Sequence, residues 1–256
     1  MNQHAPCKLC GISSRLRRKS HIIPDFMYKG IHDSVHRMVL VELGNKDAQT
    51  KWAQSGIHEK YILCEKCESL FSKLERYASH VLYGVNLKKP VVHEWRVSID
   101  GINSIFVKDI DFTKLKLCFL SILWRAHISK DKFFKKVDIT NNESEIRKML
   151  LENNCKSEDD FRIGIVGIIK TNNIPLDIVL NPQVTTIGKG EIAIFFINGF
   201  FYFIDLKPHS DFNLFQKIVL KETGEIEIPL LSGSLAKELL EAYGVDSKFL
   251  SYYLDR

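Results

Sequence analysis

The sequence lacks the long apolar runs that membrane spans and export signals require. Its most apolar stretch, residues 192–204 (IAIFFINGFFYFI), has 13 residues, fewer than the roughly 18 that indicate a span. The first residues, MNQHAPCKLCG, contain no apolar segment of the kind found in a secretory signal. We therefore expect a soluble, cytoplasmic protein with no membrane partner.

Cysteine is scarce as well, and we find neither internal repeats nor low-complexity segments. The chain has 256 residues and only six cysteines. In a cytosolic protein, cysteines are more often metal ligands than disulfide partners. The apolar share of 45% is ordinary for a globular protein, and the length fits one or two domains of about 150 residues each.

Positive charge is present in excess, but only near the N-terminus. Residues 1–80 contain 13 Lys and Arg against 8 Asp and Glu, whereas residues 81–256 contain 23 of each. The densest cluster comprises Arg15, Arg17, Arg18 and Lys19. Such a cluster attracts polyanions and suits contacts with nucleic-acid phosphates. A solvated basic loop is an equally good interpretation of the charge alone.

The pattern of apolar residues and turns predicts an α+β protein with a mostly antiparallel sheet after residue 84. Composition changes near residues 84–90, so we predict a zinc-bound domain at 1–84. An α+β domain for specificity, partner binding or oligomerisation would occupy 85–256. We expect strands within 94–110 and near 162–170, 176–187, 191–198 and 200–206; a hairpin around 222–225; turns at Asp100-Gly101, Asn172-Asn173, Lys189-Gly190 and Asn198-Gly199; and helices at 111–129, 141–154 and 233–244.

Four of the cysteines form two matched pairs, Cys7-x2-Cys10 and Cys64-x2-Cys67. Two such pairs complete the tetrahedral all-sulfur site that zinc prefers. A site closed by four thiolates has no position for substrate, so the predicted role of the Zn²⁺ is structural. The alternative is four unrelated buried cysteines. Cys118 and Cys155 have no such partners, and we interpret them as core or surface thiols.

His21 lies between the two pairs, in the motif SHIIP, and Glu68 follows Cys67 directly. The helical spacing of apolar residues after Leu63 predicts a helix opening at one of the second-pair cysteines. With an unperturbed pKa of about 6.5, histidine can accept a proton near neutral pH. The alternatives are a structural histidine at a strand end, and an acidic residue placed in the first turn by the helix dipole. We interpret the remaining histidines between the pairs as loop residues: His32, His36 and His58.

Together, the first Cys pair, SHIIP and ILCEKCESLFSKLE resemble the zinc-stapled treble-clef branch of the HNH, or ββα-metal, endonucleases, over roughly residues 5–80. The resemblance implies that His21 is a general base toward water. It places Ser20 and Glu68 at the two positions that hold a catalytic divalent metal. The family has Asp where this chain has Ser20, which is a weaker ligand, whereas Glu68 is a hard oxygen donor suited to Mg²⁺ or Mn²⁺. Three further candidates for metal ligands are Asp25, Glu75 and His80.

The resemblance favours a metal-dependent endonuclease that hydrolyses nucleic acid, with DNA as the favoured substrate. SHIIP and LCEKCE, together with the later segment LSILWRA (residues 120–126), are also similar to HNH-like proteins of bacterial and phage defence, which implies an antiviral setting. A homodimer or a partner protein that controls activity would fit. The second hypothesis is a non-catalytic zinc-stapled module that binds nucleic acid or protein, and Ser20 supports it. A purely structural zinc protein is a third.

Overall fold

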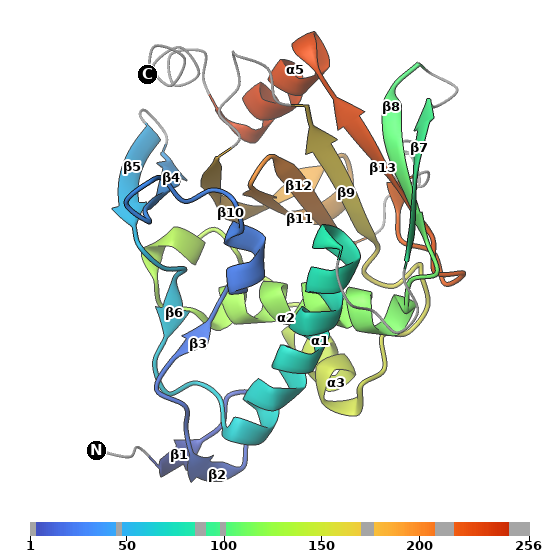
Figure 1. Ribbon diagram of the computed structural model, residues 1–256. Helices are drawn as coiled ribbons and strands as arrows, with labels where there is room; N and C mark the ends of the chain where they lie inside the picture. Colours follow the sequence, from blue (N-terminus) through green and yellow to red (C-terminus); the bar gives the residue numbers. More distant parts are fainter. Residues whose placement is uncertain are drawn as a thin grey trace.

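The structure, a computed structural model, describes residues 4–44, 48–84, 91–97, 101–169, 177–207 and 218–245. Among these residues, nine strands form one sheet in the order β5-β4-β10-β11-β12-β9-β13-β8-β7 (Figure 1). All neighbouring strands are antiparallel except the pairs β4–β10 and β9–β13. The predicted α+β class with a mostly antiparallel sheet is confirmed. The strands are β4 (Met38–Leu43), β5 (Ala48–Ala53), β7 (Val92–Val97), β8 (Asn103–Lys108), β9 (Ile163–Ile168), β10 (Ile178–Ile187), β11 (Gly190–Ile197), β12 (Phe200–Lys207) and β13 (Ile226–Leu231).

The central strands of the sheet are buried on both faces, and successive side chains of a strand point to opposite sides. On β12, Tyr202 and Ile204 join one buried cluster, while Phe201 and Phe203 join the other. The first cluster includes buried residues of the helices α1 (Glu65–Tyr83), α2 (Phe112–Ile128) and α3 (Glu143–Glu152), and the second includes those of α5 (Gly233–Tyr243). Twelve successive residues of α2, Leu115–Ala126, are buried. A helix that is apolar nearly all round belongs inside a protein.

The predicted helices and the predicted Asn198-Gly199 turn are confirmed. The helices α2, α3 and α5 match the three predicted ranges within two residues. Asn198 (φ 53°) and Gly199 (φ 78°) join β11 to β12 with the positive φ values of a tight hairpin turn. The turn before β11 lies one residue earlier than predicted, at Gly188 and Lys189. Around 222–225 the chain does turn, but the β13 strand that follows pairs with β8 and β9. The predicted Asn172-Asn173 turn and Asp100 lie outside the described residues.

The N-terminal segment contributes its own small sheets and also part of the large one. β1 (His4–Pro6) pairs with β2 (Ser13–Arg15), and β3 (Ser20–His21) pairs with β6 (His58–Glu59). Between β3 and β6 lie a 3-10 helix, η1 (Asp25–Tyr28), and the strands β4 and β5. Because β4 pairs with β10, residues on both sides of position 84 share one sheet. The division into domains 1–84 and 85–256 stays a prediction.

No helix in the described part of the chain is long and apolar enough to cross a membrane. The longest, α1, has 19 residues but is amphipathic, with the buried residues Cys67, Phe71, Leu74, Ala78 and Val81 along one face.

Candidate functional site

The four cysteines of the two predicted pairs lie together at the N-terminal end of the molecule. Their sulfur atoms are all within 4.8 Å of one another, and the Cys10 and Cys64 sulfurs are 3.9 Å apart. A zinc ion held by four thiolates at about 2.3 Å separates its ligands by roughly 3.8 Å. Cys64 is the N-cap of α1, and Gly11 (φ 75°) closes the knuckle by donating its N–H to the Cys7 carbonyl. This cluster could therefore bind a zinc ion, as predicted.

Burial and hydrogen bonds have different net effects on the pKa values of the clustered cysteines. Burial raises the pKa of Cys7, and it also raises the pKa of Cys67, where the neighbouring thiols add to the effect. At Cys64 burial acts in the same direction, but hydrogen bonds from Cys67, Cys7 and Cys10 outweigh it and lower the pKa. A bound metal ion deprotonates coordinating thiols outright. The donor set, four soft sulfurs in a closed arrangement, fits Zn²⁺.

The cysteine cluster is packed onto the rest of the protein. Leu9, between Cys7 and Cys10, is fully buried. Its carbonyl oxygen accepts a hydrogen bond of 2.6 Å from Nε of Arg147 on α3. The two remaining cysteines, Cys118 and Cys155, are both buried. Of the two predicted alternatives, core thiols or surface thiols, they are core thiols.

Ser20 and Glu68, 48 residues apart in the sequence, are in direct contact. Ser20 is fully buried, and its hydroxyl donates to Oε2 of Glu68 at 2.8 Å. Burial raises the pKa of Glu68, although the Ser20 hydrogen bond and the charge of Arg125 partly oppose the shift. The fold therefore brings together the two residues at the metal-ligand positions of the resemblance. Both are oxygen donors, which suit Mg²⁺ or Mn²⁺.

His21 follows Ser20 in β3 and is partly open to solvent. One third of its side chain is exposed, and its Nε2 lies 3.3 Å from Oδ1 of Asp25. Across the strand pair it faces His58, with ring centroids 6.0 Å apart in an edge-to-face arrangement. The prediction that His58 is a loop residue is wrong, because His58 forms β6. Residue spacing could not show this, since a two-residue strand carries no periodicity.

The three candidates for further metal ligands differ in where they lie relative to His21 and Glu68. Asp25 lies beside His21, as described. Glu75 is engaged by Arg125, whose Nη2 lies 2.7 Å from Oε1. His80 lies twelve residues along α1 from Glu68, a rise of about 18 Å, so the helix holds it far from Glu68. Asp25 is thus the one of these three candidates that lies beside His21.

Arg125 of α2 is the site residue that analysis of individual residues missed. Only 1% of its side chain is exposed, and its Nη1 donates to the backbone carbonyl of His21 at 2.6 Å. The segment that contains it was noted for its resemblance to defence proteins, which gave no role for the arginine. An apolar helix with one arginine on its buried face is the signal that could have indicated it.

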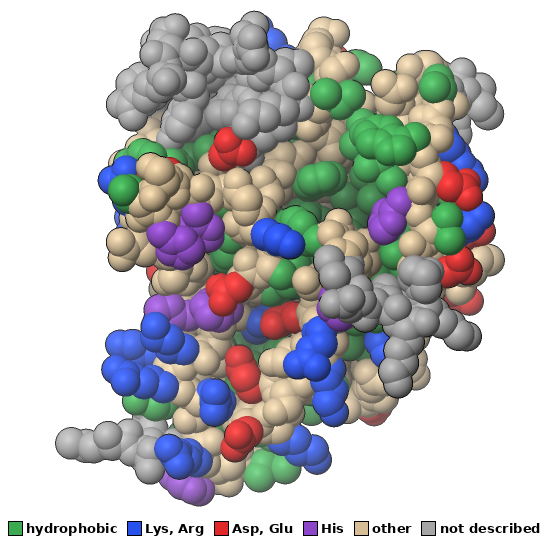
Figure 2. Space-filling view, in the orientation of Figure 1, with side chains coloured by type: hydrophobic (Ala, Val, Ile, Leu, Met, Phe, Trp, Pro, Cys, Tyr) green, Lys and Arg blue, Asp and Glu red, His purple; other side chains and the backbone are tan. Residues whose placement is uncertain are grey.

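The predicted basic cluster is exposed next to these residues. Arg15, Arg17, Arg18 and Lys19 are all exposed, and they lead into β3. Arg17 also lies 3.9 Å from Glu65 of α1. In Figure 2, Lys and Arg side chains gather over the N-terminal strands and α1, with acidic side chains between them. The basic side chains of this surface have the charge that contact with a nucleic-acid backbone would require.

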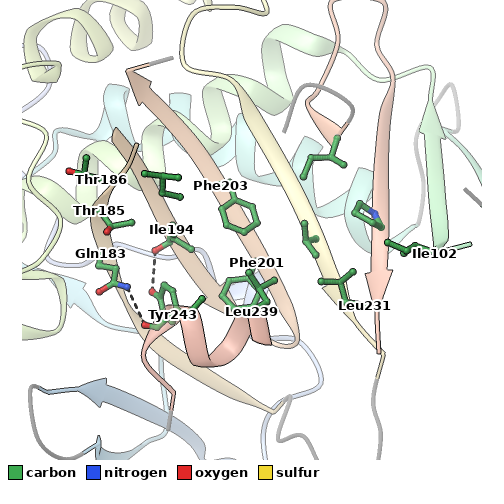
Figure 3. A pocket seen from close by; sticks show the side chains of 15 residues that line it. Ile102, Gln183, Thr185, Thr186, Ile194, Phe201, Phe203, Leu231, Leu239 and Tyr243 are labelled. Atoms are coloured by element: carbon green, nitrogen blue, oxygen red, sulfur yellow. Dashed lines mark hydrogen bonds between the residues drawn. The ribbon is translucent and has the colours of Figure 1, made fainter. Parts of the chain in front are cut away.

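A cavity of about 380 Å³ lies elsewhere, on the face of the sheet that α5 covers (Figure 3). Its described lining is mainly apolar, with Phe201, Phe203 and Leu239 on its walls and the polar side chains of Gln183, Thr185 and Thr186 on one side. No residue of the predicted site is among these described lining residues. The cavity is therefore separate from the candidate site.

Comparisons of the chain with protein-family models, with curated proteins and with solved structures found no match.

Proposed function

We propose that the protein is a metal-dependent endonuclease that hydrolyses phosphodiester bonds of nucleic acid, with DNA as the favoured substrate. The observation that carries the proposal is the contact between Ser20 and Glu68. It joins the residue before the candidate base to the residue after the last zinc ligand. In this proposal, residues 1–84 form a zinc-stapled, HNH-like ββα-metal domain in which Zn²⁺ is structural.

Each residue has a defined role in the proposed reaction. His21, with one third of its side chain exposed, accepts a proton from the attacking water. Asp25, whose Oδ1 lies 3.3 Å from Nε2 of His21, orients the imidazole. Glu68 and Ser20 would hold Mg²⁺ or Mn²⁺, which when bound offsets the negative charge of the scissile phosphate.

Substrate binding falls to the exposed basic residues Arg15, Arg17, Arg18 and Lys19. Each phosphate contact by Lys or Arg releases condensed counterions, so binding should weaken steeply with salt. The resemblance to defence proteins favours a bacterial or phage conflict setting and a cytoplasmic location. A homodimer or a controlling partner protein belongs to the same proposal.

A second candidate is a non-catalytic module that binds nucleic acid or protein. One observation favours it: the Ser20 hydroxyl already provides a hydrogen-bond partner for the Glu68 carboxylate. A buried polar group with such a partner does not need a metal to be satisfied. In addition, Ser20 and His21 are adjacent in β3, and adjacent side chains of a strand point to opposite faces. The two side chains would then lie on opposite sides of β3, which does not favour joint action on one phosphate.

The test is cleavage of supercoiled plasmid, single-stranded DNA and RNA in the presence of Mg²⁺ or Mn²⁺. The proteins are the wild type, His21→Ala, Glu68→Ala and, as a matched control, His36→Ala. We expect the wild type and His36→Ala to cut one of the substrates. Loss of a general base costs about 100- to 10,000-fold in rate, so His21→Ala should be nearly inactive. Glu68→Ala should be nearly inactive as well, because it removes the charged ligand of the proposed catalytic metal.

Zinc content and circular dichroism must match in all four proteins for the comparison to hold. Equal cutting by His21→Ala and the wild type would contradict the assigned base. Equal nucleic-acid binding by all four proteins, with no cutting under any metal, would select the binding module.

A further inference from the structure

The buried side chain of Arg125 joins α2 to both elements that carry the candidate site. Its Nη1 donates to the His21 carbonyl of β3 at 2.6 Å, and its Nη2 lies 2.7 Å from Oε1 of Glu75 on α1. The guanidinium carbon lies 5.0 Å from the centroid of the Phe71 ring. Glu75 is two helical turns from Glu68. Arg125 thus spans the gap between the strand of the candidate base and the helix of the candidate metal ligand.

The burial of this guanidinium needs a reason. Removing a charge from water costs several kcal/mol unless close partners compensate it. Within α2 the guanidinium also bonds to Ser121, from Nε to the carbonyl at 3.1 Å and from Nη2 to the hydroxyl at 3.3 Å. A planar guanidinium can serve several acceptors in a fixed geometry, which a lysine ammonium cannot reproduce. With 1% of its side chain exposed, Arg125 cannot itself touch a nucleic acid.

The residues that directly follow α2 are bonded to β6, the strand that pairs with β3. The Ser129 hydroxyl and the Lys130 amide both donate to Oε1 of Glu59, at 2.9 Å and 2.6 Å. Glu59 lies in β6, opposite Ser20 of β3. An isolated two-stranded ladder is at best marginally stable. The bonds from Arg125, Ser129 and Lys130 to this pair of strands therefore help to fix the position of β3.

We propose that Arg125 is a positioning residue of the site. Because Arg125 contacts both the His21 carbonyl and the Glu75 carboxylate, it sets the distance between the candidate base, His21, and Glu68. The inference rests on the proposed nuclease function and extends the site beyond residues 1–84. A misplacement of about 1 Å costs roughly 100-fold in rate. Removal of Arg125 should therefore reduce the rate of cleavage rather than nucleic-acid binding.

The test compares variants that remove a buried ion pair near the site and far from it. Arg125→Met/Glu75→Leu removes both charges, a replacement that is often neutral for stability. The matched control is Arg162→Met/Asp205→Leu, which removes the buried pair joining Arg162 to Asp205 of β12. We expect the first variant to retain zinc and bind plasmid within about twofold of the wild type, while single-turnover cleavage falls about 100-fold. The control should cleave at the wild-type rate, and Arg125→Lys should recover only part of the loss.

A second readout does not depend on activity. In protein labelled with ¹³C and ¹⁵N at histidine, the His21 imidazole signal is assigned by its loss in His21→Gln. We expect it to shift or broaden in the Arg125 variant and not in the Arg162 variant, with His93 of β7 as internal reference. An unmoved His21 signal would overturn the inference, whether or not cleavage changes. If the wild type cuts no substrate, the proposed function fails, and this signal alone still decides whether Arg125 positions His21.

Discussion

Ser20 is the residue at which the candidate site departs from the family that the sequence resembles. Its hydroxyl is fully buried and donates to Glu68 at 2.8 Å. A hydroxyl is a weaker ligand for a hard cation than a carboxylate. Glu68 thus carries the only formal charge of the Ser20–Glu68 pair, and a metal bound there would take most of its charge compensation from Glu68 and from the substrate phosphate.

Substitution of Ser20 by Asp should make the fold depend on a divalent cation. Two carboxylates in contact repel each other in a partly buried place, so we expect Ser20→Asp to lower the free energy of unfolding by about 1–3 kcal/mol without metal. Mn²⁺ bound between them should recover most of the loss. Thermal unfolding with and without millimolar Mn²⁺ measures this.

Ser20→Ala is the matched control for this substitution. It also removes the hydrogen bond but adds no charge, so Mn²⁺ should stabilise it much less than Ser20→Asp. Equal responses of the two variants to Mn²⁺ would show that the ion is not held between residue 20 and Glu68.

At the scale of elements, local signals were sufficient for the helices that follow residue 84, namely α2, α3 and α5. The range predicted for α2 was correct because Asp111 caps it and apolar residues recur at helical spacing. The Asn198-Gly199 pair likewise specifies its turn without help from the rest of the fold. The strands β4 and β5 were not predicted, because β4 is fixed by its pairing with β10. That pairing joins residues about 140 positions apart, and no local pattern contains it.

The cap of α2 gives a prediction at this scale. Oδ1 of Asp111 accepts a hydrogen bond of 3.0 Å from the amide of Lys114. We expect Asp111→Ala to lower the free energy of unfolding by about 1 kcal/mol, measured by urea denaturation. Ser232, the N-cap of α5, makes no side-chain capping bond within the described residues, so Ser232→Ala should change stability by only a few tenths of a kcal/mol. Equal losses in both variants would mean that the Asp111 hydrogen bond contributes nothing.

For the whole molecule, the candidate site is assembled from parts that the sequence separates widely. The cysteine cluster was predictable, because zinc-ligand spacing is a local signal repeated twice. The contacts of Arg125 with His21 and Glu75 join three distant elements, and they depend on how α2 packs against α1. The structure also places Cys7, Cys64 and Cys67 in the same buried cluster as residues of α2 and the central strands, with Cys10 packed against it. The core does not stop at residue 84.

This continuity predicts how the protein unfolds when zinc is removed. Because one buried cluster contains Cys7, Cys64 and Cys67 as well as residues of α2 and β12, we expect a single cooperative transition in calorimetry, with about one zinc per chain. Structural zinc contributes several kcal/mol, and 1 kcal/mol is worth about 2–4 °C in a chain of this size. Chelation should therefore lower that one transition by roughly 10 °C or more.

The shape of the calorimetric trace tests the predicted division of the chain. Two separate transitions, of which only one responds to chelation, would show that residues 1–84 unfold as an independent domain. One transition that moves as a whole would show that zinc binding stabilises the nine-stranded sheet as well. In that case the loss of the metal would also displace β3, since the Cys64 amide donates to the Cys7 sulfur and Arg17, three residues before Ser20, pairs with Leu63. Zinc would then support the geometry of the candidate site without taking part in its chemistry.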